Sequence, residues 1–69
     1  MTVSQVLSLA TATEKIELIL VSYAGTLHID QQIIKGVKSD AAITAHNSKP
    51  VSHYTYFPDS GKYNIVSVT

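Results

Sequence analysis

The sequence predicts an α+β fold, in which a short N-terminal helix is followed by about five antiparallel strands in an open sheet or a small SH3-like barrel. A capping pattern and a helical spacing of apolar residues occur at the N-terminus. β-Branched and aromatic residues dominate the later segments, which is typical of strands. Glycine and proline are dispersed between these segments, where turns would join them.

The chain has 69 residues, and we expect residues 1–69 to form a single domain, because this length supports only one hydrophobic core. It contains no cysteine, so disulfides cannot stabilise it, and we expect a cytoplasmic location. The longest apolar run is far shorter than a membrane span, so we expect a soluble protein with no membrane partner. Charged residues make up only 14% of the chain, which favours a surface covered by a partner.

The first helix is predicted over residues 3–11. Thr2 and Gln5 have the spacing of a capping box, in which each residue satisfies a free N–H group of the first turn. The apolar residues that follow recur at helical intervals: Val3, Val6, Leu7 and Ala10.

Residues 15–23 fit either a helix or a strand. Thr11 and Glu14 repeat the capping-box pattern, which would begin a helix here. We favour a strand, because isoleucine and valine are stiff at χ1 and suit strands better than helix interiors. A turn at Ala24-Gly25 would then pair this strand with the next segment. That register predicts four opposed pairs: Ile16 with Ile33, Leu18 with Gln31, Leu20 with Ile29, and Ser22 with Leu27.

The clearest local prediction is a C-terminal hairpin. Residues 51–57 and 62–68 are rich in strand-forming residues, and the four residues between them, 58–61, have the sequence Pro-Asp-Ser-Gly, which is typical of a turn. One earlier segment, residues 41–46, is predicted as a short, weak strand.

Pairing Phe57 with Lys62 across this turn gathers large side chains on one face of the hairpin. Three of the four tyrosines are among them. Tyrosine is enriched in the cores of protein interfaces, so this face is the candidate partner-binding surface. Its members are Tyr54, Tyr56, Tyr63 and Ile65. The same rings would also suit the core of the domain, and the sequence leaves both roles open.

The sequence contains no catalytic, metal or cofactor signature. The three histidines are scattered, and no serine lies in the Gly-x-Ser-x-Gly elbow of a hydrolase. Ser60-Gly61-Lys62 is only a fragment of a phosphate-binding loop. We therefore expect a protein that is not an enzyme and that uses no metal and no cofactor.

These observations favour a small protein-binding module, such as an inhibitor, adaptor or accessory subunit, that docks through a face or an edge of its sheet. The alternative is a module for single-stranded nucleic acid that stacks bases on the tyrosine face. A short chain without disulfides also favours self-association, and we expect a homodimer. Its predicted interface is Ile19, Val21 and Tyr23.

The charge content predicts little or no affinity for duplex DNA at physiological salt. Five lysines balance five acidic residues, and there is no arginine to contact phosphates. Fluorescence anisotropy with a labelled duplex measures this affinity. A sub-micromolar, steeply salt-dependent dissociation constant at neutral pH would contradict the prediction.

Overall fold

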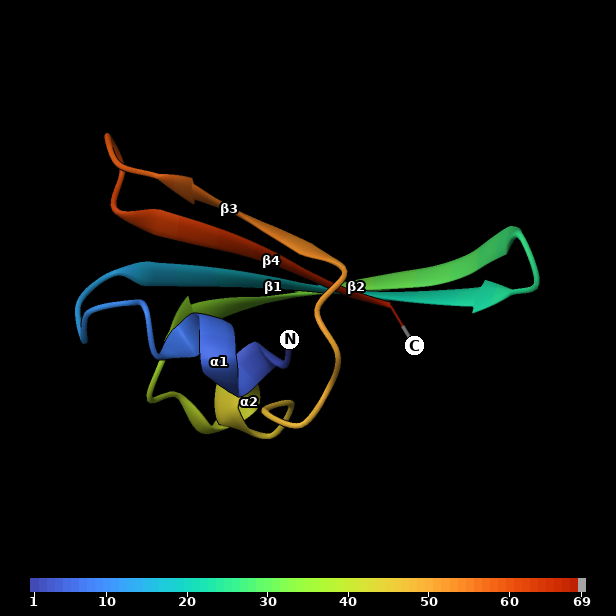
Figure 1. Ribbon diagram of the computed structural model, residues 1–69, viewed down its shortest axis with the longest axis horizontal. Helices are drawn as coiled ribbons and strands as arrows, with labels where there is room; N and C mark the ends of the chain where they lie inside the picture. Colours follow the sequence, from blue (N-terminus) through green and yellow to red (C-terminus); the bar gives the residue numbers. More distant parts are fainter. Residues whose placement is uncertain (69) are drawn as a thin grey trace.

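The computed structural model, which describes residues 1–68, contains four strands and two short helices (Figure 1). Their order along the chain is α1 (Val3–Leu7), β1 (Lys15–Ala24), β2 (Leu27–Val37), α2 (Ala41–Thr44), β3 (His53–Phe57) and β4 (Lys62–Val68). In the sheet, the strands lie in the order β2-β1-β4-β3, so β1 and β4 are central and β2 and β3 are edges. The predicted α+β class and its N-terminal helix are confirmed, and the sheet is open rather than a barrel.

The two central strands run parallel. Their register pairs Lys15 with Lys62 and continues to Val21 with Val68. The β1–β2 and β3–β4 pairs are antiparallel. The prediction of about five antiparallel strands is therefore wrong in the strand count and in the direction of the central pair. Parallel strands need a long connection, and the chain between β1 and β4 passes through β2, α2 and β3.

Both capping pairs that the sequence contains form, but only one begins a helix. The Gln5 side chain accepts the N–H of Thr2 at 2.7 Å, and α1 follows but ends at Leu7, short of the predicted residue 11. The Glu14 side chain accepts the N–H of Thr11 at 2.8 Å in the same way. There the bond closes a turn, because the chain enters β1 at the next residue and its backbone groups pair with neighbouring strands.

The predicted strand over residues 41–46 is wrong, since this segment contains α2. Alanine is the best helix former, and this stretch is rich in it. The carbonyl of Asp40 accepts the N–H groups of Ile43 and Thr44, which begins the helix. The Ile43 side chain is fully buried in the core between the helices and the sheet, so packing of this side chain holds the short helix in place.

The strand predicted at residues 15–23 is confirmed, but the register of its hairpin is wrong. The turn is Gly25-Thr26, where Gly25 has a φ of 63°, a value that glycine adopts without strain. A register shift next to Ser22 leaves Ile29 as an additional residue in β2. As a result, the four predicted pairs do not form: Ile16 lies opposite Gly36, Leu18 opposite Ile34, Leu20 opposite Gln32 and Ser22 opposite Asp30.

The core lies between the two helices and one face of the sheet, and Figure 1 shows both helices on this side. It consists of Val3, Val6, Leu7, Ala10, Ile16, Leu18, Leu20, Ile43, Tyr63 and Ile65. Two long-range hydrogen bonds join its layers. The Lys38 ammonium donates to the carbonyl of Ala10 at 2.8 Å, and the buried Ser67 hydroxyl donates to the carbonyl of Pro50 at 2.6 Å. No helix of residues 1–68 lies on the opposite face of the sheet.

The packing of α2 predicts that Ile43→Ala strongly destabilises the domain. Truncating a fully buried isoleucine removes apolar contacts and leaves a cavity, which costs about 2–5 kcal/mol of unfolding free energy. Leu9→Ala is the control, because Leu9 follows α1 and is exposed. Urea unfolding followed by circular dichroism measures both. Equal unfolding midpoints for the two variants would contradict the position of α2.

Candidate functional site

The tyrosine cluster, Tyr54, Tyr56 and Tyr63, forms as the sequence predicts. The predicted pairing of Phe57 with Lys62 is confirmed, and it places Tyr56 opposite Tyr63 and Tyr54 opposite Ile65. The ring of Tyr63 lies between the other two, with centroid distances of 4.6 Å to Tyr56 and 6.4 Å to Tyr54. Such tilted ring pairs stabilise a packed cluster.

The four predicted partner-binding residues divide between core and surface. Ile65 is fully buried, and Tyr63 is only 8% exposed, with its hydroxyl donating to the carbonyl of Leu9 at 3.3 Å. Tyr54 and Tyr56 lie on the edge strand, beyond the cover of the helices, and are 38% and 40% exposed. Tyr54 and Tyr56 can therefore contact a partner directly, whereas the buried Tyr63 and Ile65 pack beside them on β4.

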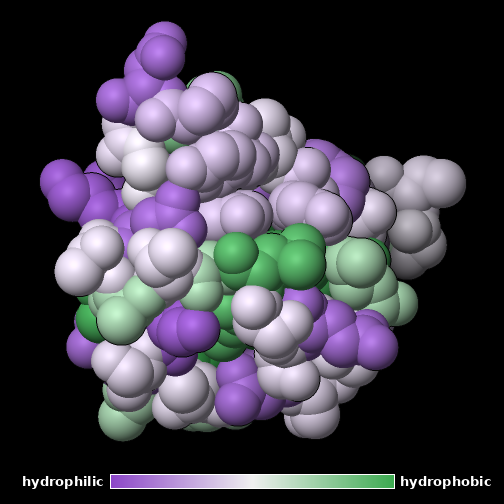
Figure 2. All heavy atoms as spheres, turned by 60° about the vertical axis from the view of Figure 1, so that its left-hand side comes forward, coloured by the Kyte–Doolittle hydropathy of each residue, from purple (hydrophilic) through white to green (hydrophobic). Residues whose placement is uncertain are grey.

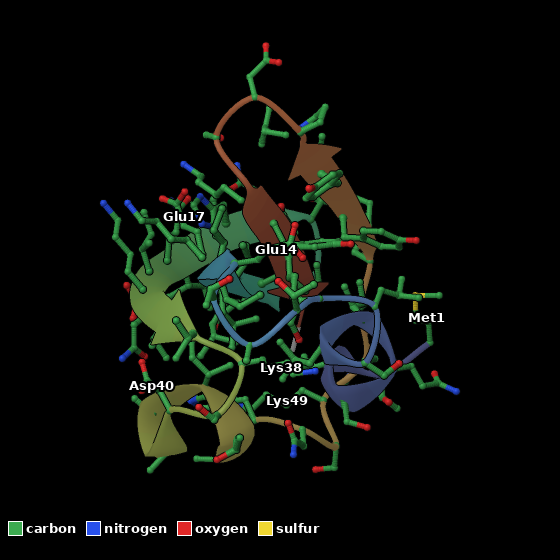
Figure 3. The ribbon with its side chains drawn as sticks, turned by 90° about the vertical axis from the view of Figure 1, so that its left-hand side faces the viewer. Met1, Glu14, Glu17, Lys38, Asp40 and Lys49 are labelled. Atoms are coloured by element: carbon green, nitrogen blue, oxygen red, sulfur yellow. The ribbon has the colours of Figure 1, made fainter. Side chains whose placement is uncertain are left out.

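A carboxylate that the sequence analysis did not place here belongs to this site. The Tyr56 hydroxyl donates to Glu14 at 2.6 Å, although the two residues are 42 positions apart in the chain. This hydrogen bond, with that from the Thr11 N–H, holds the pKa of Glu14 below its ordinary value, and it raises the pKa of Tyr56. In Figure 3, Glu14 lies at the near end of the sheet. Glu14 is therefore anionic at neutral pH, and the described residues bring no lysine to within ion-pair distance of it.

The edge strand β3 lacks the features that normally block pairing with another strand, and it is here called an unprotected edge. All five of its residues are exposed, and none of them is a proline or a lysine. Its pairing with β4 contains no register shift. The other edge, β2, carries the additional residue Ile29, the charges of Asp30 and Lys35, and contacts with α2. Bulges, charges and covering elements are the devices that keep sheet edges from pairing, and β3 has none of them.

The face of the sheet away from the helices, here called the open face, is apolar in its middle and charged at one end. Its middle row consists of Ile33, Ile19, Val66 and His53 across the four strands. Towards the start of β1 the face carries Glu17, whose carboxylate forms an ion pair with Lys62 at 2.8 Å. The hydrogen bond from Lys62 is the main reason that the pKa of Glu17 is lowered. Figure 3 shows Glu17 on the side away from the helices.

A pocket of about 570 Å³ lies at this charged end. It is lined by Lys15, Ile16, Glu17, Lys35, Gly36, Val37, Asp40 and Lys62. A general acid or base works best with a pKa near the working pH. The pKa of Glu17 in this pocket is lowered, as is that of Glu14 beside Tyr56, so both carboxylates are ionised near neutral pH and neither is tuned for proton transfer there. Among residues 1–68, no three histidine or acidic side chains come together in a way that could hold a metal ion.

The β1–β2 hairpin continues beyond the body of the sheet as an arm, residues 23–29, on the right of Figure 1. The last described pair between β1 and β4 is Val21 with Val68, so no third strand of residues 1–68 pairs with the arm. Leu27 and Ile29 are 69% and 62% exposed, and the Tyr23 ring lies against His28 at 5.5 Å.

The other end of the molecule, which faces the viewer in Figure 2, shows mainly polar residues around one compact apolar patch.

The predicted oligomer-interface residues lie on or near the open face. Ile19 is half-buried in its middle row, Tyr23 is 45% exposed on the arm, and Val21 is buried between them. Val21 can therefore contribute little contact area of its own, and the residue paired with it on β4, Val68, is 37% exposed.

No protein-family model, curated protein or solved structure matches this chain. Neither helix of the described residues has the length and apolar character needed to cross a bilayer.

The contact between Tyr56 and Glu14 predicts a titration change in Tyr56→Phe. Without the hydroxyl, the pKa of Glu14 should rise towards its ordinary value of 4.5. Because the folded-state pKa of Glu14 is lowered, its contribution to stability is present above the unfolded-state pKa and is lost as the pH falls through the folded-state pKa. The stability advantage of the wild type over Tyr56→Phe should therefore shrink in acid.

Carbon-13 NMR of the side-chain carboxyl measures this pKa directly. Tyr54→Phe is the matched control, and it should leave the Glu14 midpoint unchanged. An unchanged midpoint in Tyr56→Phe would mean that the hydrogen bond does not form in solution.

Proposed function

We propose that this chain is a non-enzymatic protein-binding module that binds an extended segment of a partner protein along β3. The observation that carries the proposal is the combination of an exposed, unprotected edge strand with two half-exposed tyrosines. An inhibitor, an adaptor and an accessory subunit all use such a surface.

The binding mode is strand addition. An edge strand presents a row of backbone N–H and C=O groups that a second extended chain can pair with, and these hydrogen bonds supply affinity without regard to side chains. The side chains of the added strand alternate between two faces. On the helix side they would meet Tyr54 and Tyr56, and on the other side Thr55 and Phe57. Specificity then comes from an apolar side chain of the partner seated against the two rings.

The charge next to the tyrosines defines the partner further. Glu14 is anionic and has no lysine beside it, so a lysine or arginine in the bound segment would find a counter-charge near Tyr56. The same carboxylate repels phosphates, and the burial of Tyr63 leaves only two rings for base stacking. These features favour a protein partner over single-stranded nucleic acid.

Selection from a display library of random linear peptides tests the proposal, with the wild-type chain as bait. Fluorescence anisotropy then measures the affinity of each synthetic peptide for the wild type and for Tyr54→Ala and Tyr56→Ala. We expect each substitution to weaken binding by about tenfold or more, as for aromatic residues at the centre of an interface. The selected peptides should share an apolar residue and a basic residue.

Tyr23→Ala is the matched control, because Tyr23 has a similar exposed fraction but lies on the arm. It should leave peptide affinity unchanged, and circular dichroism should show that all three variants are folded. A library that yields no peptide dependent on Tyr54 or Tyr56 would contradict the proposal. Competition of the peptides by a single-stranded oligonucleotide would assign the site to nucleic acid instead.

A further inference from the structure

We infer that the open face and the arm form the interface of a two-fold dimer, in which the arm of each copy lies across the open face of the other. The open face extends onto β3, but the dimer contacts argued below lie on β1, β2 and the arm, and β4 separates them from the edge used in strand addition. The dimer and the proposed peptide-binding function can therefore be tested separately, and failure of one does not contradict the other.

The arm needs a covering surface. A two-stranded hairpin without a third strand or a packed helix is only marginally stable in water. The arm nevertheless carries three large exposed side chains: Tyr23, whose ring contacts that of His28, Ile29, and Leu27, which is paired one position along from Tyr23 and so faces the other side of the arm. Contact of these apolar side chains with water is unfavourable, and on a projecting hairpin it is removed only when another surface packs against them.

The open face lacks a cover in the same way. Ile33 is 47% exposed in its middle row, and Ile19 and Val66 beside it are half-buried only by their neighbours in the sheet. A sheet that faces water on one side normally alternates apolar and polar residues, with the polar ones outward. Here the outward positions in the middle of three adjacent strands are aliphatic. This pattern indicates a second packing surface.

The lengths of the two surfaces match. The turn at Gly25-Thr26 lies four to five residues beyond Val21, which corresponds to about 15 Å at the rise of a strand. From Val21 back to Lys15, the open face extends for six residues, or about 20 Å. An arm that folds over the face of a second copy therefore covers the part of the middle row on β1 and β2, Ile19 and Ile33, and stops short of the charged end.

Charge selects the direction of packing. The open face carries Lys15, Lys35 and Lys62 at one end, where Glu17 and, in the adjoining pocket, Asp40 are the acidic residues. Two copies packed with their strands parallel would bring these lysines together. Antiparallel packing places them at opposite ends of the dimer, beyond the tip of the other copy's arm. Residues 23–27 of that arm carry no charge, so no like charges are opposed.

A second copy is the occupant that these surfaces fit best, because each copy supplies both the apolar arm and the apolar face. A two-fold axis near Val21 places Tyr23 of one copy over Ile19 of the other, and Ile29 over Ile33. Such an interface is isologous: every contact occurs twice, which is the commonest arrangement in soluble oligomers. β3 lies outside the overlap and stays free.

Sedimentation equilibrium of the full chain tests the dimer. The wild type should be a dimer at high micromolar concentration. Ile33→Glu, which places a charge in the middle of the interface, should raise the dissociation constant by about tenfold or more. Leu9→Glu is the matched control, because Leu9 is also an exposed aliphatic residue but lies on the helix side, and it should remain dimeric. A wild type that is monomeric, or a dimer that Ile33→Glu does not weaken, overturns the inference.

Cross-linking tests the geometry, and the absence of native cysteine makes introduced thiols unique. A bismaleimide reagent that spans about 10 Å, the spacing of packed sheets, should link Ile29→Cys chains to Ile33→Cys chains when the two variants are mixed. Ile33→Cys alone should link poorly, because the two-fold axis separates its two copies along the strands. The reverse result, efficient linking of Ile33→Cys to itself and none in the mixture, would exclude the antiparallel arrangement.

Discussion

The structure depends on the parallel pairing of β1 with β4. This pairing brings two strands that are distant in sequence to the centre of the sheet, where Ile16 and Leu18 lie beside Tyr63 and Ile65. These four side chains form the centre of the core, with Leu20 and Ile34 beside them, and the residues of the two helices pack against it. Residues 1–68 form only two short helices, of five and four residues, and these cover just one face of the sheet. The other face and the edges are therefore left exposed.

Three apolar or unpaired surfaces are left uncovered: the β3 edge, the open face and the arm. They differ in what they can bind. The β3 edge offers backbone groups to an extended chain of any sequence, and Tyr54, Tyr56 and Glu14 add selectivity. The open face offers aliphatic side chains without free backbone groups, so it suits a packed surface rather than a strand. Among the described elements, the arm is the one that projects beyond the body of the sheet and can supply that surface to a second copy. The two proposals therefore assign different occupants for different physical reasons.

The parts of the fold that local chemistry determines were predictable from the sequence. The Pro-Asp-Ser-Gly turn fixed the pairing of Phe57 with Lys62, and β-branched residues favoured a strand at β1. The contacts between distant segments were not predictable. Nothing local signals the parallel pairing, the additional residue Ile29, or the burial of Ile43 that makes a helix of an ambiguous segment. For the same reason the sequence placed the tyrosines on one face but could not reveal that Tyr63 is buried and bonded to the carbonyl of Leu9, or that Glu14 reaches Tyr56.

The central claim is that packing on one side leaves the arm to be covered by another molecule of the same chain. Amide hydrogen exchange, measured by NMR over a range of protein concentrations, tests it residue by residue, because exchange reports the local opening of each hydrogen bond. The account predicts that exchange of the arm amides, residues 23–29, slows as the concentration rises, while exchange along β3 does not change. Arm amides that exchange at the same rate at every concentration would contradict it.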